Sequence, residues 1–405
     1  MLNVKYILLI IITCFFYSCN ESSRLLHITD RQIGEEKNVI SIIPEKDDLK
    51  QFDFTPYLDS IKYVKLELTD ESLIGTIDKL IIYNERIYIL DKLTSGLFVF
   101  NIDGSFVYKI ARIGQGPGEY TMIDFFDIDI ENKHIVLTDL MTYWIMRYDL
   151  DGKFLFKKKI PVWCEGVSVL PNKGIVLYAN FRNNSNKLAQ EYNLIYLDSA
   201  MNYKQAYFPY NSKYINQKIP TSFGGQFFTY ENHLNFSFPG GSVVYQITGD
   251  SLFSKYQFDF SKDMLPVENP ANSEQLNEYL AKGNYNGFLT PIIENDQLLL
   301  FTMRTNIDMP LLMAYYVFCF KNSGTIVSSF FLNIENEFYM NIPLTCYKNW
   351  IVSEIQSYSL IEWKNSFKKE KLSSVHRFTK ERLAIAENLS EEDNPVLMFY
   401  KLKQF

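Results

Sequence analysis

The chain has 405 residues, with 40 basic and 47 acidic side chains and a formal net charge of −7. Hydrophobic residues make up 47% of it and aromatic residues 16%, which is typical of a globular protein rich in β-sheet. The densest basic runs, Lys157–Lys159 and Lys368–Lys369, are short, and we expect them at solvated ends of strands or helices. An acidic chain without a basic stripe repels phosphate backbones, so we expect no nucleic-acid partner.

The first 18 residues have the pattern of a secretory signal peptide. Lys5 precedes an apolar run from Tyr6 to Tyr17, which is too short to cross a bilayer as a helix. Ser18 and Cys19 then resemble the lipobox of bacterial lipoproteins, in which cleavage exposes the cysteine amine and the thiol carries a diacylglycerol. We therefore expect residues 1–18 to be removed and Cys19 to be lipidated. Cleavage nearby without lipidation is the alternative.

Residues 19–50 are polar with scattered charges, which favours a tether between the lipid and a folded domain over residues 51–405. A short strand is expected around Val39–Ile43 within it. The remaining cysteines, Cys164, Cys319 and Cys346, lie far apart and match no metal-binding or redox spacing. We expect buried thiols, no metal site and no cofactor, while a disulfide between two of them stays open.

A near-repeat dominates the next part of the chain. The segment from Ile87 to Ile110 recurs between Ile135 and Lys158, so that Asp91 and Asp139 lie 48 residues apart. Both copies contain an Asp-Gly pair flanked by alternating apolar residues, which is a strong signal for a β-hairpin. A period of this length predicts propeller blades, each a four-stranded antiparallel sheet.

Strand and turn signals predict six blades in all, over residues 77–110, 125–160, 166–208, 226–260, 289–332 and 339–402. The sixth lacks an outer strand, and Ile61–Leu68 provides a spare one near the other end of the chain. We therefore predict an all-β, six-bladed β-propeller that is closed by antiparallel pairing of Ile61–Leu68 with Val396–Leu402.

Two stretches favour helices instead of strands, at about residues 261–287 and 358–388. The first would connect two blades and the second would join the middle strands of the sixth blade. In a propeller both kinds of connection emerge on the same face. Because rigid blades position the loops on such a face, we expect the binding site there.

The loop Ile110–Tyr120 joins the first two blades and carries glycines on either side of Pro117. Together with Lys65–Glu67 and Asp393–Val396, it resembles the six-bladed β-propeller lipoproteins of Bacteroidota, which are similar to NHL-repeat propellers. The resemblance spans Asp53 to Leu402. It implies an exported, lipid-anchored propeller of the cell envelope, tethered to the outer membrane, and it implies no particular activity.

Eight residues are the candidates for ligand binding: Asp91, Arg112, Gln115, Glu119, Tyr120, Asp139, Arg182 and Arg304. The two aspartates end strands at the predicted face, where they would either meet a ligand or cap the following turn. The three arginines would form a cationic mouth for an acidic sugar or a peptide carboxylate. Alternatively, they are exposed and paired with nearby acids. The other three would face a ligand or bind neighbouring loops.

Motifs for catalysis are lacking in the sequence. The four histidines are scattered, and neither zinc-hydrolase nor serine-hydrolase patterns occur. A carboxylate pair such as Asp91 and Asp139 would still allow acid–base chemistry. The leading hypothesis is a binding or scaffold module for a glycan, a peptide or an envelope protein. The alternatives are a lyase or hydrolase that uses carboxylates and arginines at the channel mouth, and a structural subunit of an envelope complex.

Overall fold

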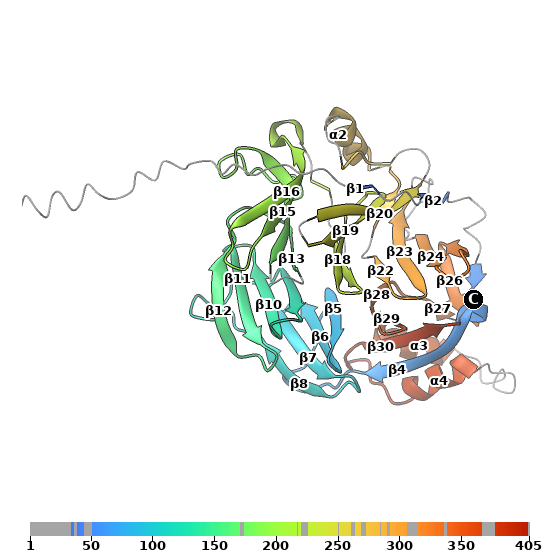
Figure 1. Ribbon diagram of the computed structural model, residues 1–405. Coiled ribbons are helices and arrows are strands. Elements are labelled where there is room, and N and C mark those ends of the chain that lie inside the picture. Colours follow the sequence, from blue (N-terminus) through green and yellow to red (C-terminus); the bar gives the residue numbers. More distant parts are fainter. Residues whose placement is uncertain are drawn as a thin grey trace, which may run out of the picture.

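The sheets of the protein are arranged around a central axis (Figure 1). The computed structural model describes residues 34–35, 39–43, 51–170, 174–216, 218–219, 226–249, 251–260, 264–268, 273–283, 285–289, 292–305, 315–335, 338–366 and 377–403. Residues 1–18 and Cys19 lie outside these ranges. No helix within the ranges is long and apolar enough to cross a membrane.

The near-repeat folds into two successive four-stranded antiparallel sheets, as predicted. Sheet I consists of β5 (Lys79–Tyr83), β6 (Arg86–Asp91), β7 (Gly96–Asn101) and β8 (Phe106–Ile110). Sheet II consists of β9 (Phe125–Asp129), β10 (His134–Asp139), β11 (Trp144–Asp149) and β12 (Phe154–Lys159).

The Asp-Gly turns let adjacent sheets approach closely. Gly104 and Gly152 have φ of +93° and +80°, which favours glycine. A Cβ atom at Gly104 would lie 2.1 Å from the Lys65 carbonyl oxygen of the preceding sheet. At Gly152 it would lie 2.8 Å from the ring of Tyr108 in sheet I. The repeated glycine is therefore required by packing between sheets as well as by the turn.

Two further four-stranded sheets continue the ring. Sheet III consists of β13 (Gly166–Val169), β14 (Ile175–Tyr178), β15 (Glu191–Leu197) and β16 (Tyr203–Tyr210), which is followed by the short 3-10 helix η3 (Ser212–Tyr214). Sheet IV consists of β17 (Phe227–Tyr230), β18 (His233–Ser237), β19 (Val243–Thr248) and β20 (Ser251–Asp259). The segments β1 (Gly34–Glu35) and β2 (Val39–Ser41) pair in parallel with β20. The strand expected near Val39 is thus confirmed.

Sheet V is formed by late parts of the chain, whereas sheets VI and VII combine early and late parts. Sheet V consists of β21 (Gly287–Phe288), β22 (Ile293–Glu294), β23 (Leu298–Arg304), β24 (Tyr315–Phe320) and β25 (Ile326–Ser329). Sheet VI consists of β28 (Pro343–Tyr347), β29 (Trp350–Ile355), β30 (Val396–Leu402) and β4 (Leu58–Lys65). Sheet VII consists of β3 (Gln51–Asp53), β26 (Phe331–Ile334) and β27 (Phe338–Tyr339).

The prediction of six blades is wrong, because the described residues form seven sheets. Sheet VII arises where β26 leaves sheet V and pairs in parallel with β3. Local sequence gives no sign of this contact, because the paired residues lie 280 positions apart. The predicted blades therefore divide the segment from Phe331 to Tyr339, with the fifth ending at Leu332 and the sixth beginning at Tyr339. The sheets are also separate units, and none of the seven described here closes on itself.

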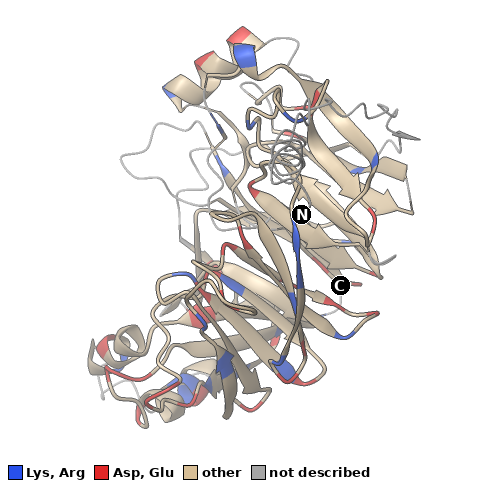
Figure 2. Ribbon diagram, turned by 90° about the vertical axis from the view of Figure 1, so that its left-hand side faces the viewer, with Lys and Arg blue, Asp and Glu red and all other residues tan. Residues whose placement is uncertain are grey.

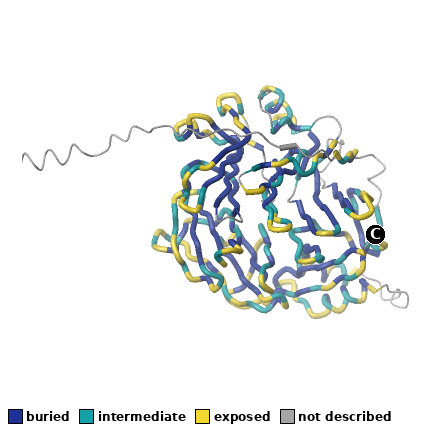
Figure 3. Tube along the Cα trace, in the orientation of Figure 1, coloured by how far each residue is buried: buried dark blue, intermediate teal, exposed yellow. Residues whose placement is uncertain are grey.

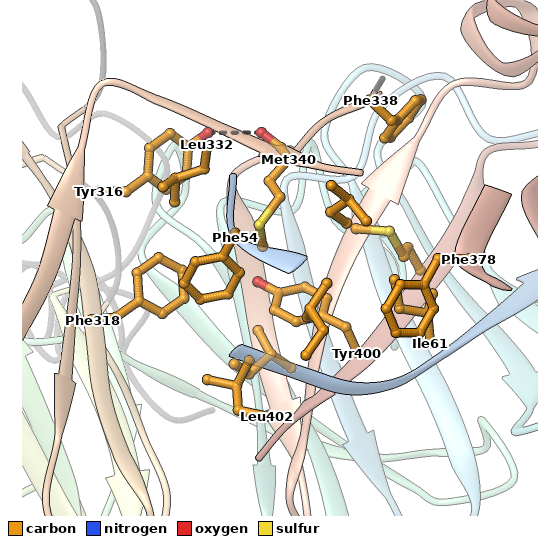
Figure 4. Close-up of a cluster of buried hydrophobic side chains, with 14 of the residues drawn as sticks. Phe54, Ile61, Tyr316, Phe318, Leu332, Phe338, Met340, Phe378, Tyr400 and Leu402 are labelled. Carbon is orange, nitrogen blue, oxygen red and sulfur yellow. Dashed lines mark hydrogen bonds between the residues drawn. The ribbon is translucent and has the colours of Figure 1, made fainter. Parts of the chain in front are cut away.

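The predicted pairing between β4 and β30 is present within sheet VI. The strands are antiparallel, with Val396 opposite Lys65 and Tyr400 opposite Ile61. Figure 4 shows the buried cluster beside this seam, where Phe54 faces Phe318 and lies near Tyr400. The rings of Phe54 and Phe318 have their centroids 4.5 Å apart. The N-terminal segment therefore contributes to the same core as β30 and sheet V.

The described residues contain three α-helices, in the two stretches where helices are expected. Helix α2 (Ser273–Lys282) follows sheet IV, and α3 (Ser357–Ser366) and α4 (Arg377–Ala386) lie between β29 and β30. The antiparallel strand order places both connections at the same end of their sheets. Figure 3 shows buried positions along the strands and exposed ones mainly in turns and helices. Residues 261–263, 269–272, 284 and 367–376 of the predicted insertions lie outside the described ranges.

The buried cluster beside the β4–β30 pairing allows a test of stability. Phe54 is completely buried and packs on Tyr57 as well as on Phe318. We expect Phe54→Ala to lower the free energy of unfolding by about 3–5 kcal/mol, because it removes a buried ring and leaves a cavity. The matched control is Phe156→Ala, whose ring is 42% exposed and whose loss should cost less than about 1 kcal/mol. Equal losses in chemical denaturation would contradict this role for Phe54.

Candidate functional site

A cavity of about 1010 Å³ is lined by the inner strands of the propeller. Neighbouring inner strands contact one another around the axis, with β5 between β28 and β9 and with β22 beside β17 and β28. Apolar side chains such as Ile81, Phe227 and Ile293 form much of the wall. The charged and hydroxyl groups of the lining include Asp78, Lys79, Asp127, Ser168, Glu294 and Glu354.

Two carboxylates, those of Asp78 and Glu354, belong to the lining of the cavity. Glu354 lies near the end of β29, and its Oε2 atom is buried without a hydrogen-bond partner. Burial and then the neighbouring charge of Asp78 raise the pKa of Glu354 to about 7. Asp78 itself accepts hydrogen bonds from the Thr76 hydroxyl at 2.7 Å and from the Lys92 backbone N–H at 2.8 Å. Of the two carboxylates, Glu354 is therefore the one with a buried oxygen that lacks a hydrogen-bond partner.

A buried lysine occupies the wall next to this pair. The Lys79 ammonium donates to the Phe126 carbonyl oxygen at 2.8 Å. Burial lowers the pKa of Lys79, and the nearby Asp127 opposes that effect. Asp127 accepts hydrogen bonds from the Ser168 hydroxyl and from the Val169 backbone N–H, the latter at 2.9 Å. These bonds join the inner strands of sheets I, II and III.

A cluster of ionic groups surrounds Glu294, whose side chain has no exposed surface. Its carboxylate binds the Lys255 ammonium at 2.8 Å, the Lys321 ammonium at 2.7 Å and the Tyr256 hydroxyl at 2.8 Å. Both ammonium groups also lie over the ring of Tyr230, at 4.8 and 4.0 Å from its centroid. Both oxygens of Glu294 thus accept hydrogen bonds from partners in sheets IV and V, which favours a structural role.

The two predicted aspartates cap turns. Asp91 accepts hydrogen bonds from the backbone N–H groups of Gly75 and Leu93 at 2.8 and 2.9 Å. Asp139 accepts from the Thr121 backbone N–H and hydroxyl at 2.7 and 2.8 Å and from the Thr142 N–H at 3.0 Å. Burial raises the pKa of Asp139, but these hydrogen bonds outweigh it and hold the pKa below its usual value.

The predicted residues of the glycine-rich loop divide into exposed and buried ones. The Tyr120 hydroxyl donates to carbonyl oxygens of Ser95 and Ile110 at 3.0 Å, and burial raises its pKa to about 12. Glu119 accepts the Gly116 backbone N–H at 2.7 Å. Arg112 and Gln115 are exposed. Tyr120 and Glu119 therefore stabilise the loop through these hydrogen bonds, whereas Arg112 and Gln115 face solvent.

The other predicted arginines have separate partners. Arg182 pairs with Glu165 at 2.8 Å. The Arg304 guanidinium donates to the Gly283 carbonyl oxygen after α2 and lies 4.9 Å from the centroid of the Tyr285 ring. The structure does not bring Arg112, Arg182 and Arg304 onto a common group, and none of the eight predicted residues lines the cavity.

The residues that do line the cavity were absent from the sequence-based candidates. One signal was available for Glu354, because it interrupts the apolar strand from Trp350 to Ile355. A charge within a strand that is otherwise buried needs a partner or a function. Its proximity to Asp78 depends on the contact between β28 and β5, which only the folded arrangement reveals.

The raised pKa of Glu354 predicts a pH-dependent stability. Between roughly pH 4.5 and 7 the folded protein keeps a proton that the unfolded chain releases, so stability falls as pH rises through this window. Glu354→Gln is neutral throughout. We expect its free energy of unfolding to match that of the native protein at pH 4 and to exceed it by on the order of 2 kcal/mol at pH 8, where its Tm should therefore be higher. The exposed control Glu71→Gln should show no such divergence in thermal unfolding, and parallel curves for all three proteins would contradict the assignment.

The Glu294 cluster predicts a loss of stability. We expect Glu294→Gln to cost about 3 kcal/mol in chemical denaturation, because Lys255 and Lys321 then lack a counter-charge in a largely buried site. The control is Glu85→Gln at an exposed pair with Lys348, where little change is expected. Equal effects of the two substitutions would show that the Glu294 cluster is not a structural ion cluster.

Comparisons with known proteins agree with the propeller fold. A crystal structure from Bacteroides fragilis, described as that of an exported protein, has a TM-score of 0.70 at 19% identity and covers 91% of this chain and 100% of that one. A member of the DUF4221 family from Bacteroides vulgatus has a TM-score of 0.48 at 9% identity, covering 85% and 97%. No curated protein matches this sequence. The family described as "Domain of unknown function (DUF4934)" matches residues 37–401, and the chain belongs to that family.

Proposed function

We propose that the protein is an exported binding module whose ligand occupies the central cavity. The observation that carries the proposal is Glu354, which lines a mainly apolar cavity of about 1010 Å³ and has a carboxylate oxygen, Oε2, without a hydrogen-bond partner. Pockets of this size with a few placed polar groups are the usual form of a binding site for small ligands. The exposed Arg112 and Gln115 remain candidates for contacts with parts of a ligand outside the cavity.

An envelope location supports this function. Residues 1–18 have the pattern of a signal peptide, and Cys19 follows a small residue as in lipoproteins. The similar protein from Bacteroides fragilis is described as exported. We propose that lipid on Cys19 tethers the module to the outer membrane. Glycans, peptides and envelope proteins are the ligand classes present in that compartment.

Among these classes, the cavity favours a peptide with a free amino terminus. The amino group would bind Glu354, beside the second carboxylate of Asp78. The apolar wall formed by residues such as Ile81 and Phe227 would accommodate apolar side chains. A buried carboxylate has its pKa raised until a cation compensates the charge, so an ammonium ligand would stabilise the ionised form of Glu354.

The proposal is tested with a pooled library of short apolar peptides, prepared with free and with N-acetylated amino termini. The immobilised full chain should retain the free peptides selectively, as measured by mass spectrometry. We expect Glu354→Gln to weaken their binding by about ten- to one-hundredfold, because a charged hydrogen bond contributes roughly 1.5–3 kcal/mol. The control Glu71→Gln alters an exposed glutamate and should bind like the native chain.

The pH dependence gives a second criterion. Glu354 ionises near pH 7, and a peptide amino group stays protonated up to about pH 8. Binding should therefore be strongest between these values and weaken on both sides. Equal retention of free and acetylated peptides, or retention of neither, would contradict a site for amino termini.

A hydrolase or lyase is the second candidate function. The observation in its favour is the pKa of about 7 for Glu354 beside the carboxylate of Asp78, since an acid with that pKa can donate and accept protons at neutral pH. The same incubations distinguish the two functions. Retained peptides of unchanged mass support a binding module, whereas shortened products that disappear with Glu354→Gln support an enzyme.

A further inference from the structure

A cluster of lysines and aromatic rings lies at the outer edge of sheet II, away from the central cavity. Lys157 and Lys159 are two residues apart on β12, so their side chains point to the same face of the sheet. Both ammonium groups lie over the indole of Trp144 on the adjacent strand β11, at 4.9 and 4.3 Å from the ring centroid. Figure 2 turns the side of the molecule that carries these strands toward the viewer.

The cluster continues into the connections of sheet III. Lys187 lies over the rings of Trp163 and Tyr143, at 4.9 and 5.4 Å, and the two ring centroids are 6.4 Å apart. Burial lowers the pKa of Lys187, and the charge of Lys159 also acts to lower it. Tyr143 and Trp144 are consecutive residues, so the ring under Lys187 adjoins the ring under Lys157 and Lys159 in the chain. Three ammonium groups thus lie over three aromatic rings, all of which are half-buried.

These three positive charges have no acidic partner in the part of the chain that the structure describes. No ion pair among the described residues includes Lys157, Lys159 or Lys187. Carboxylates in this part of the molecule are already engaged. Asp124 accepts the Leu140 backbone N–H, and Glu165 binds Arg182 and Lys218.

The ammonium groups of Lys157 and Lys159 also retain hydrogen-bond donors for a ligand. The ammonium groups of Lys157 and Lys159 each donate to one carbonyl oxygen, of Gly116 and Thr142. An ammonium group has three donors, so at least one further acceptor can bind to each. In a protein with a net charge of −7, a group of uncompensated lysines is a local exception that favours an anionic ligand.

We propose that this cluster, formed by Lys157, Lys159, Lys187, Trp144, Trp163 and Tyr143, is a binding site for an acidic polysaccharide that carries carboxylates along its chain. The Cα atoms of Lys157 and Lys159 are about 7 Å apart along the extended strand, which suits successive acidic groups of a polymer better than one small anion. The aromatic rings beside the ammonium groups would contact the apolar C–H surfaces of the sugars. The location on an edge strand leaves room for a long chain.

The test measures binding of polygalacturonate to the full chain by isothermal titration calorimetry at low salt. The triple variant Lys157→Gln, Lys159→Gln, Lys187→Gln should weaken binding by roughly tenfold or more, and binding by the native chain should fall steeply with added salt. The charge-matched control replaces three exposed lysines, Lys153, Lys213 and Lys380, with Gln. It removes the same net charge and should bind like the native chain. Neutral dextran should not bind.

A second variant separates recognition from folding. Trp144→Leu keeps an apolar side chain under Lys157 and Lys159 but removes the indole, and we expect weaker polygalacturonate binding with an unchanged far-UV circular dichroism spectrum. Equal weakening by the cluster triple and the control triple would overturn the proposal, because it would show only a response to net charge. Absence of binding by the native chain would overturn it as well. Stronger lysine-dependent binding to phosphatidylglycerol vesicles than to polygalacturonate would overturn it in favour of a membrane contact.

Discussion

The pairing of β4 with β30 is the constraint on which the arrangement of the cavity depends. This contact joins residues more than 330 positions apart, and the loop entropy lost in forming it must be recovered from burial. The adjoining cluster provides that burial, since Phe54, Met398 and Tyr400 are completely inaccessible to solvent. Because β29 lies next to β30, the same pairing fixes the strand that carries Glu354. The position of Glu354 in the candidate site therefore depends on the pairing of β4 with β30.

The carboxylates that line the cavity differ in whether the fold provides hydrogen-bond partners for them. Glu294 binds two lysines and a tyrosine hydroxyl, and both oxygens of Asp127 accept hydrogen bonds, so the fold provides partners for both carboxylates. Glu354 has no such compensation for its Oε2 atom and remains protonated up to neutral pH. Glu268 also has a buried oxygen without a partner and a pKa raised to about 7, but it does not line the cavity. Glu354 is therefore identified by two properties together, its unpartnered oxygen and its position in the cavity lining, where a ligand could compensate its charge.

Local sequence predicted much of the fold and little of the site. Asp-Gly turns and alternating apolar residues are signals within a few positions, so sheets I and II and the spare strand near Ile61 were predicted correctly. The number of sheets was not, because β26 meets β3 through a contact that no local pattern encodes. Asp91 and Asp139 were conspicuous because they repeat, yet repetition reflects the turns that every blade needs. Glu354 is not part of the repeat, as expected for a residue whose role belongs to the whole molecule and not to each blade.

Lysines over aromatic rings recur in this protein, so the cluster on sheet II can be compared with the other contacts of this kind. Lys62 lies over Phe399 within sheet VI, and Lys92 of sheet I lies over Phe125 of sheet II, so that single lysines cover rings at strand and sheet contacts. Such a contact needs only one cation. At Trp144 two ammonium groups share one indole, and a third lies nearby. Lys255 and Lys321 also share one ring, that of Tyr230, but there the carboxylate of Glu294 binds both ammonium groups. The lysines over Trp144 have no such ion pair among the described residues, and the proposed anionic ligand would supply it.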